Sequence, residues 1–307
     1  MASRSQGIVP IAVAAMLWGT TGTAAHLLPD EISPLATGSA TMAIGGIALF
    51  AASAAGAIRV LRDRRSVGWL LTGAVGVFVY PLAFYSSMHL AGVAIGTVVS
   101  LGAAPVFAAV LEFVVDAQRV TRRWVLSAAV AVCGLALLAL SGSSGPGGRM
   151  QIGGVLLGLL AAFSYALYTF ASARVMGENH SSRAVMGALF GAGAVLLAPV
   201  LVLTGAALLG STASLAITAY LAIGPMFLAY LLFGAGLRYV RGSTATVVTL
   251  LEPVVATVLA VTVVGERLTP TGWAGLAFVT AGILLLVLPA RDAPDAGGEP
   301  LGEGPRL

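Results

Sequence analysis

Charged side chains are scarce in this chain of 307 residues: they make up 9% of it, while 58% of the residues are hydrophobic. Soluble globular domains carry about 25% charged residues to cover their surface. A helix that crosses a bilayer needs about 20 apolar residues, so ten spans would use about 200 residues and leave about 100 for loops and tails. The composition excludes an ordinary soluble domain and predicts an all-α integral membrane protein with ten transmembrane helices.

Lysine is absent, and all 16 basic residues are arginine. Without lysine the chain can form neither a Schiff-base cofactor site nor a phosphate-binding loop, whose lysine reaches the nucleotide phosphates. These exclusions argue against a pump with its own ATP site, and we expect no cofactor.

Cysteine and histidine are nearly absent as well. The single cysteine, Cys133, cannot form an intrachain disulfide. The three histidines are scattered without the spacing of a metal site, so we expect no metal. The net charge of +4 would suggest nucleic acid in a soluble protein, but here the arginines occupy short loops between apolar runs. We therefore expect the lipid bilayer and a small molecule as partners, and no nucleic acid.

Apolar runs bounded by turn residues and charges mark the expected spans. They fall at residues 8–28, 34–58, 67–89, 93–115, 124–141, 152–173, 184–204, 214–237, 243–264 and 271–290. The first run could also be read as a signal peptide, but it is long enough to cross the membrane.

The arginines predict the orientation of the spans, because basic residues accumulate in cytoplasmic loops. With the N-terminus inside, 14 of the 16 arginines fall on the cytoplasmic side, and only Arg149 and Arg267 lie outside. If one span had been missed, every later loop would change sides, and the cytoplasmic and outer arginines would no longer separate so clearly. We expect a multi-pass protein of the cytoplasmic (inner) membrane with both termini in the cytoplasm, and the bias toward Ala, Gly and Arg suggests a GC-rich bacterial source.

The two halves of the chain resemble each other. The segment "AAMLWGTTG" (14–22) aligns with "AAFSYALYT" (161–169), and "TVVSLGAAPVFAAVL" (97–111) aligns with "TVVTLLEPVVATVLA" (246–260). Because each half holds five expected spans, an odd number, the second half would cross the membrane in the opposite sense. An inverted repeat of this kind is typical of alternating-access transporters with a site near the bilayer midplane.

Four short motifs resemble the EamA repeat of the drug/metabolite transporter superfamily: "LWG" at 17–19, "APVF" at 104–107, "LLEPV" at 250–254 and "GERLT" at 265–269. The resemblance implies an N-terminal segment 1–7, a first EamA repeat over 8–142, an outer linker 143–151 and a second repeat over 152–290. The acidic, Pro- and Gly-rich tail 291–307 cannot bury a core and is expected to be disordered.

The same resemblance implies a secondary active transporter, most simply an exporter of small metabolites. It also implies a central cavity built from the first, third, fourth, sixth, eighth and ninth spans. The second, seventh and tenth spans carry few polar groups and are expected to face lipid.

Glu252 is the sharpest candidate for a functional residue. It lies about halfway along the ninth expected span, where a charge costs about 2.5 to 3.5 kcal/mol, and no arginine lies at that depth. Desolvation favours its neutral form, which suits proton coupling or the binding of a cationic or amino group. Pro253 lacks an N–H and should free a carbonyl one turn back, around Thr249. The alternative is a protonated glutamate that only hydrogen-bonds a neighbouring helix.

Aromatic residues in the expected cavity-forming spans are the other candidates for substrate binding. An aromatic cavity with one acid suits amphipathic cargo such as apolar amino acids or organic cations, although aromatics also pack between helices. With Glu252, the candidate substrate-binding residues are Trp18, Tyr80, Tyr165, Tyr168 and Tyr230. The indole N–H of Trp18 lies mid-span and requires a partner inside the protein.

Two further residues are candidates for gates. Glu112 lies one turn before Asp116, where it can reach the interface and pair with Arg119, or alternatively form a cytoplasmic gate. His89 lies at an expected outer helix end, where an outer gate would be.

Three G-x-x-x-G pairs permit close helix approach: Gly92/Gly96, Gly154/Gly158 and Gly187/Gly191. With 39 glycines some pairs arise by chance, so a homodimer is left open.

Other function classes fit the sequence less well. An intramembrane enzyme would need a Ser/His pair, two membrane aspartates or an aspartate-rich metal motif, but all five aspartates lie in loops, tails or helix ends. A channel would show a ring of charges. We therefore predict no enzymatic activity, and keep a facilitative uniporter or exchanger without proton coupling as the alternative.

Overall fold

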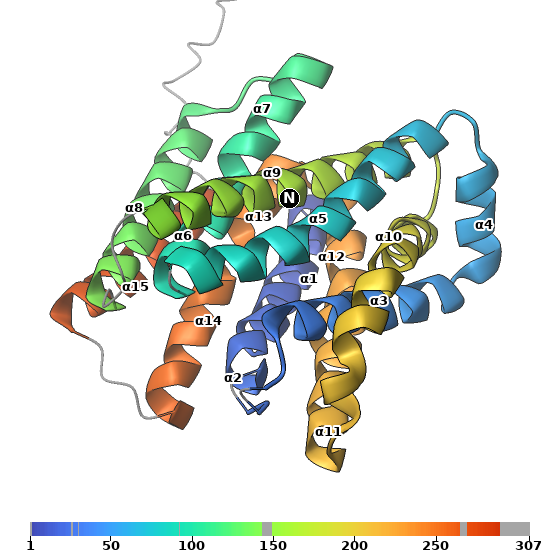
Figure 1. Ribbon diagram of the computed structural model, residues 1–307. Helices are drawn as coiled ribbons and strands as arrows, with labels where there is room; N and C mark the ends of the chain where they lie inside the picture. The colour runs from blue at the N-terminus through green and yellow to red at the C-terminus, as the bar shows by residue number, and fades with distance from the viewer. Residues whose placement is uncertain are drawn as a thin grey trace, which may run out of the picture.

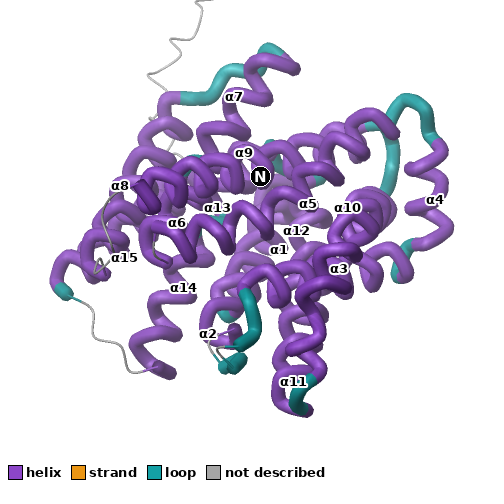
Figure 2. Tube along the Cα trace, in the orientation of Figure 1, coloured by secondary structure: helices purple, strands orange, loops and turns teal. Residues whose placement is uncertain are grey.

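The computed structural model describes residues 2–25, 27–29, 31–91, 93–142, 149–264 and 269–288 of the chain. Within these ranges every regular element is a helix, as Figure 1 and Figure 2 show. The predicted all-helical class is therefore confirmed for the described part of the chain.

Each half of the chain supplies a run of helices. The elements of the first half are α1 (Ala2–Gly19), α2 (Thr21–Ala25), α3 (Pro34–Ala51), α4 (Ala54–Arg62), α5 (Val67–Ala91), α6 (Val93–Gly102), α7 (Ala104–Asp116) and α8 (Arg122–Gly142). Those of the second half are α9 (Arg149–Gly177), α10 (Ser182–Thr204), the 3-10 helix η1 (Gly205–Leu209), α11 (Thr212–Leu221), the π-helix η2 (Ala222–Leu228), α12 (Ala229–Leu237), α13 (Gly242–Val248), α14 (Leu251–Leu259), the π-helix η3 (Ala260–Val264) and α15 (Pro270–Val287).

Nine helical stretches of the described chain are long and apolar enough to cross a membrane. They correspond to nine of the ten expected spans, and α8 occupies the place of the fifth expected span without being among them. The chain is thus a multi-pass membrane protein, while the count of ten and the inversion of the second half stay predictions.

Several expected spans are interrupted rather than continuous. The second breaks at Ala52 and Ser53 between α3 and α4, and the fourth breaks at Ala103 between α6 and α7. The ninth breaks at Thr249 and Leu250 between α13 and α14. Proline contributes to the last two breaks, because Pro105 and Pro253 follow within a turn and lack the N–H that a continuing helix would use.

Polar side chains cap the N-terminal ends of several helices. Ser33 Oγ accepts from Ala36 N at 3.1 Å at the start of α3, and Ser181 Oγ accepts from Ala184 N at 3.3 Å at the start of α10. Thr269 caps α15, with Pro270 as its first residue. These caps satisfy backbone donors that the first turn leaves without a helical partner.

Three helix pairs form the frame of the molecule: α5 with α9, α8 with α15, and α3 with α10. Figure 1 shows α5 beside α9 and α8 beside α15. Small residues permit these contacts. A Cβ on Gly154 of α9 would lie 2.5 Å from Ala91 Cβ, and one on Gly191 of α10 would lie 2.9 Å from Phe50 Cδ2. Two of the three G-x-x-x-G pairs therefore pack against helices of the same chain. These two pairs are not evidence for a homodimer.

The connection between α4 and α5 is tied to the one between α9 and α10. His180 Nε2 lies 2.9 Å from Asp63 Oδ2 and 3.1 Å from Ser66 Oγ. The backbone N–H of Arg65, together with His180 and Ser66, holds the pKa of the Asp63 carboxyl below its usual value. This cluster joins the two halves outside the spans, and the carboxylate stays charged at neutral pH.

Some expectations concern residues outside the described ranges. These are the tail 291–307, most of the linker 143–151, most of the "GERLT" motif and one member of a glycine pair, Gly92. Two helices begin before the expected spans: α1 begins at Ala2, and α9 begins at Arg149 within the expected linker, while the apolar stretch of α9 that can cross a membrane begins at Ile152, where the span was expected.

The packing of α9 against α5 predicts different effects for two adjacent glycines. Gly154→Ala should lower the thermal unfolding midpoint in detergent, because its Cβ would lie 2.6 Å from the Ala91 backbone N and overpacking costs about 1–3 kcal/mol. The control is Gly153→Ala, whose Cβ would meet only Leu90 Cδ1 at 3.9 Å. Equal unfolding midpoints for the two variants would contradict this packing.

Candidate functional site

A cavity of about 80 Å³ lies where α1, α3, α5, α9, η2, α12 and α14 meet. All six residues predicted to bind cargo line it: Trp18, Tyr80, Tyr165, Tyr168, Tyr230 and Glu252. The sequence thus predicted which residues come together, while their role in binding stays a prediction.

The lining also includes residues that the sequence reasoning missed. Gly38, Thr41 and Met42 of α3 face the cavity, so the expectation that the second span only faces lipid was wrong. Conversely, no residue of α6 or α7 is among the lining groups of the described chain, although the fourth span was expected to contribute. The polar Thr41 beside small glycines was the signal that could have identified α3. Further lining residues are Thr21, Pro81, Phe84, Tyr85, Pro225 and Met226.

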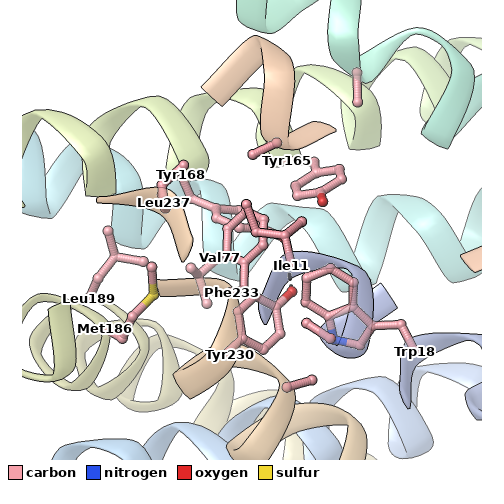
Figure 3. Packing of buried hydrophobic residues seen from close by; sticks show 14 of the residues in the cluster. Ile11, Trp18, Val77, Tyr165, Tyr168, Met186, Leu189, Tyr230, Phe233 and Leu237 are labelled. Carbon is pink, nitrogen blue, oxygen red and sulfur yellow. Dashed lines mark hydrogen bonds between the residues drawn. The ribbon is translucent and has the colours of Figure 1, made fainter. Parts of the chain in front are cut away.

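Seven of the fifteen residues that line the cavity are aromatic. Figure 3 shows Trp18 beside Tyr230, and their ring centroids lie 4.9 Å apart. Tyr165 lies 5.7 Å from Tyr80 and 5.2 Å from Tyr168, again between centroids. These tilted contacts are favourable aromatic geometries, and they present ring faces and edges to whatever enters the cavity.

Hydrogen bonds between the helices hold the polar ends of these rings. Trp18 Nε1 donates to the Pro225 carbonyl oxygen at 2.7 Å, which supplies the internal partner expected for this indole. Tyr168 and Tyr230 share a hydrogen bond of 2.8 Å between their hydroxyls. Tyr165 donates to Thr249 Oγ1 at 2.9 Å. The wall is therefore fixed by contacts that join α1 to η2, α9 to α12, and α9 to the break in the ninth span.

Glu252 lies directly after that break, as the second residue of α14. The carbonyl of Thr249 was expected to be free because Pro253 cannot donate to it. Instead, it accepts from Glu252 N at 2.9 Å, one residue earlier than in a regular α-turn. This tight turn corrects the expectation: the Thr249 carbonyl is occupied, and the Thr249 hydroxyl accepts a hydrogen bond from Tyr165.

The carboxyl group of Glu252 has no ionic partner in the described part of the chain. The ion pairs found there join Arg174 to Asp116 and His180 to Asp63. A close approach by α1 limits the space around the backbone of Glu252, since a Cβ on Gly19 would lie 2.9 Å from the Glu252 carbonyl oxygen. The acid is thus set into an aromatic cavity where a cation or a proton can neutralise it.

Glu112 occupies a different place from the one expected. It is buried, with 6% of its surface exposed, and it bonds Ser243 and not Arg119. Ser243 N donates to Oε1 at 2.9 Å, and Ser243 Oγ donates to Oε2 at 2.6 Å. The pairing with Arg119 was wrong because the carboxyl points into the protein, toward the start of α13. The contact joins the two halves of the chain.

Another contact between the halves lies at the break between α1 and α2. Thr20 Oγ1 and the Tyr220 hydroxyl of α11 are 2.7 Å apart. His89, the other gate candidate, is exposed near the C-terminal end of α5. This contact is one of several hydrogen bonds between the halves, and Tyr220 is a residue that the sequence did not single out.

Known proteins are similar to this chain over nearly its whole length. The model of the EamA-like transporter family matches residues 5–140 and again residues 152–288. The uncharacterized transporter YwfM of Bacillus subtilis is 33% identical over 90% of this chain and 92% of its own. The probable terminal-alkyne amino-acid exporter of Streptantibioticus cattleyicolor is 25% identical over 92% and 93%. A crystal structure with 22% identity covers 92% of this chain and 96% of its own with a TM-score of 0.75, which shows the same fold.

The bond between Trp18 and Pro225 predicts a loss of stability in Trp18→Phe. The substitution keeps an aromatic ring but leaves a buried carbonyl without its donor, which costs about 1–3 kcal/mol. The thermal unfolding midpoint in detergent should fall. Trp273→Phe is the control, because Trp273 is 52% exposed. The same small change in both variants would contradict a structural role for the indole N–H.

Proposed function

The chain belongs to the EamA-like transporter family, and we propose that it is a secondary active transporter that exports small metabolites by alternating access. The single observation that carries the proposal is the cavity of aromatic rings around Glu252, an acid with no ionic partner in the described chain. The names of the relatives, which are transporters or an exporter, support the same class. They point away from an enzyme.

The size of the cavity supports a closed or nearly closed conformation. Its volume of about 80 Å³ is well below the about 300 Å³ at the lower end of common ligand pockets. A cargo molecule therefore requires the halves to move apart before it can reach Glu252. Alternating access supplies that movement, because one end of the path opens while the other stays closed.

Contacts between the halves are the candidates for gates at the two ends. Glu112 with Ser243 closes the end at the start of α13, which the arginine distribution assigns to the cytoplasm. Thr20 with Tyr220 closes the opposite end. At about 1.5 Å per residue, Ser243 lies about 13 Å along the ninth span from Glu252, the residue of this span that lines the cavity.

Glu252 is proposed to couple transport to a proton or to bind a cationic group of the cargo. In its neutral form it can stay in the apolar cavity, and in its charged form it attracts a cation that the rings also favour. Apolar amino acids and amphipathic cations present such a group. The relative from Streptantibioticus, named as a probable exporter of terminal-alkyne amino acids, favours the amino-acid class.

A uniporter or exchanger without proton coupling is the second candidate. It would use the same cavity and gates, with Glu252 serving only to bind cargo. On the basis of the arginine distribution, we also propose that the protein lies in the inner membrane with both termini in the cytoplasm.

Glu252→Gln tests the coupling role. Glutamine keeps the shape and hydrogen-bonding capacity of the acid but cannot release a proton, so we expect a folded protein that no longer accumulates cargo with a pH gradient. Counterflow in proteoliposomes at two pH values, with a panel of amino acids, nucleosides and organic cations, provides the measurement. Glu178→Gln, an exposed acid between α9 and α10, is the control. Proton-driven accumulation by the Glu252→Gln variant at the wild-type level would disprove coupling through this residue.

Glu112→Ala tests the inner gate. Removing the carboxylate leaves both donors of Ser243 without an acceptor, so the closed state of this end should lose stability relative to the open state. A cysteine at Thr246 in a Cys133→Ala background reports on access, since Thr246 is 1% exposed. We expect a membrane-impermeant maleimide to label it faster in the Glu112→Ala protein in inside-out vesicles.

The control for this labelling is Glu178→Ala, which removes an exposed acid. Equal labelling rates in wild type and Glu112→Ala would rule out the gate.

A further inference from the structure

A second cavity, of about 160 Å³, lies outside the central one and shares none of its lining residues. We name it the vestibule. It is bounded by the end of α7, by α9 and by the residues that begin α13. Its lining includes Glu112, Asp116, Phe170, Arg174, Arg241 and Gly242.

The vestibule holds two acidic and two arginine side chains, which is unusual for a chain with only 9% charged residues. Asp116 and Arg174 form an ion pair across it, from α7 to α9. The guanidinium carbon of Arg174 also lies 5.3 Å from the ring centroid of Trp69. These contacts fix the positions of one acid and one base before any ligand arrives.

The other two charged groups keep hydrogen-bonding capacity. Arg241 Nη1 donates to the Arg119 carbonyl oxygen at 3.3 Å, which is a long bond and the one contact of this guanidinium within the described chain. Its remaining N–H donors can therefore serve a ligand. Each carboxylate oxygen of Glu112 accepts one hydrogen bond from Ser243 and retains a further lone pair.

Next to these groups lies a buried hydroxyl without a partner in the described chain, Thr169 Oγ1. Thr169 is fully buried, and its Cγ2 lies 3.3 Å from the point where a Cβ on Gly242 would be. Glu112 Oε1 lies 3.5 Å from the same point. Glycine at this position thus keeps open the space between Thr169 and the carboxylate, at the wall of the vestibule.

We propose that the vestibule binds a small zwitterion, an α-amino acid, with its carboxylate on Arg241 and its ammonium group between Glu112 and Asp116. The proposal rests on the proposed function and names its cargo class: the vestibule is the site where cargo is first held before it passes the inner gate. The apolar side chain of the amino acid lies against Phe170 and Ala173.

Charge selects this class. The volume of the vestibule, about 160 Å³, is also below the about 300 Å³ of common ligand pockets, so the side chains around it must move apart to take a whole amino acid. A simple anion would meet the two carboxylates, and a simple cation would meet the two guanidiniums. Only a ligand with both charges can pair with the carboxylates and the guanidiniums together. Electrostatic repulsion therefore disfavours analogues that carry a single charge.

Binding in the vestibule also acts on the gate. Glu112 belongs to both the vestibule and the inner gate, because the carboxylate that would accept the ammonium group also accepts hydrogen bonds from Ser243. An ammonium group on the remaining lone pairs neutralises part of the negative charge that attracts the Ser243 donors. Occupancy of the vestibule therefore weakens the contact that closes the path to the central cavity.

Equilibrium binding of radiolabelled L-valine to the protein in nanodiscs tests the proposal. Arg241→Gln removes the charge that holds the carboxylate, and Arg238→Gln, an exposed arginine one turn earlier, is the matched control. We expect wild type and Arg238→Gln to bind L-valine at two sites, while Arg241→Gln weakens one of them about tenfold, or about 1.4 kcal/mol. Trp18→Ala should weaken the other site, in the central cavity.

Competition with singly charged analogues of valine completes the test. 3-Methylbutanoate lacks the ammonium group and isobutylamine lacks the carboxylate, so each should displace L-valine from the Arg241-dependent site far less well than unlabelled L-valine. Equal displacement by 3-methylbutanoate would overturn the proposal, because it would reveal a simple anion site.

Two further results separate this inference from the proposed function. If binding is lost in Trp18→Ala but unchanged in Arg241→Gln, the vestibule is not a binding site, while the transporter proposal stands. If L-valine does not bind at all, the vestibule proposal fails, and counterflow with the nucleoside and cation panel decides the proposed function separately.

Discussion

The hydrocarbon core of a bilayer offers no hydrogen-bond partner to a peptide group, and most of this structure follows from that constraint. Continuous helices satisfy their own backbone, so a break can be tolerated only where protein groups replace the lost bonds. Two breaks lie at the central cavity, after α1 and between α13 and α14, and the π-helix η2 also lines it. At the cavity, therefore, other groups of the protein supply hydrogen-bond partners to the backbone, which the lipid cannot do.

The same constraint explains why the polar groups of the cavity are bonded across helices. Trp18 bonds the Pro225 carbonyl, Tyr165 bonds Thr249, and Tyr168 bonds Tyr230. Each bond fixes one helix to another at the depth where cargo would pass. Glu252 differs from these residues in lacking an ionic partner among the described groups, and this difference makes it the reactive group of an otherwise satisfied site.

Composition and apolar runs predicted the helical membrane class, and residue type together with depth predicted six residues that line one cavity. Details that depend on local geometry were not predictable. The position of Glu112 depends on how α7 faces α13, and sequence spacing favoured Arg119 on the same stretch of chain over Ser243, which is 131 residues away. The contribution of α3 was missed because Thr41 and Gly38 carry little signal in an apolar run. The turn at Thr249 was missed because a proline shows which donor is lost but not which donor replaces it.

The π-helix η2 has a consequence for the register of the helix that follows it. A π turn holds about one residue more than an α turn, and each residue of an α-helix advances by about 100° around the axis. Converting η2 to a regular α-helix would therefore rotate α12 by about that angle and turn Tyr230 away from Tyr168. The indole of Trp18 holds η2 through the carbonyl of Pro225, the fourth of its 7 residues. One hydrogen bond from α1 thus helps to set the rotation of α12 about its own axis, although the bonded residues, Trp18 and Pro225, are 207 residues apart in the chain.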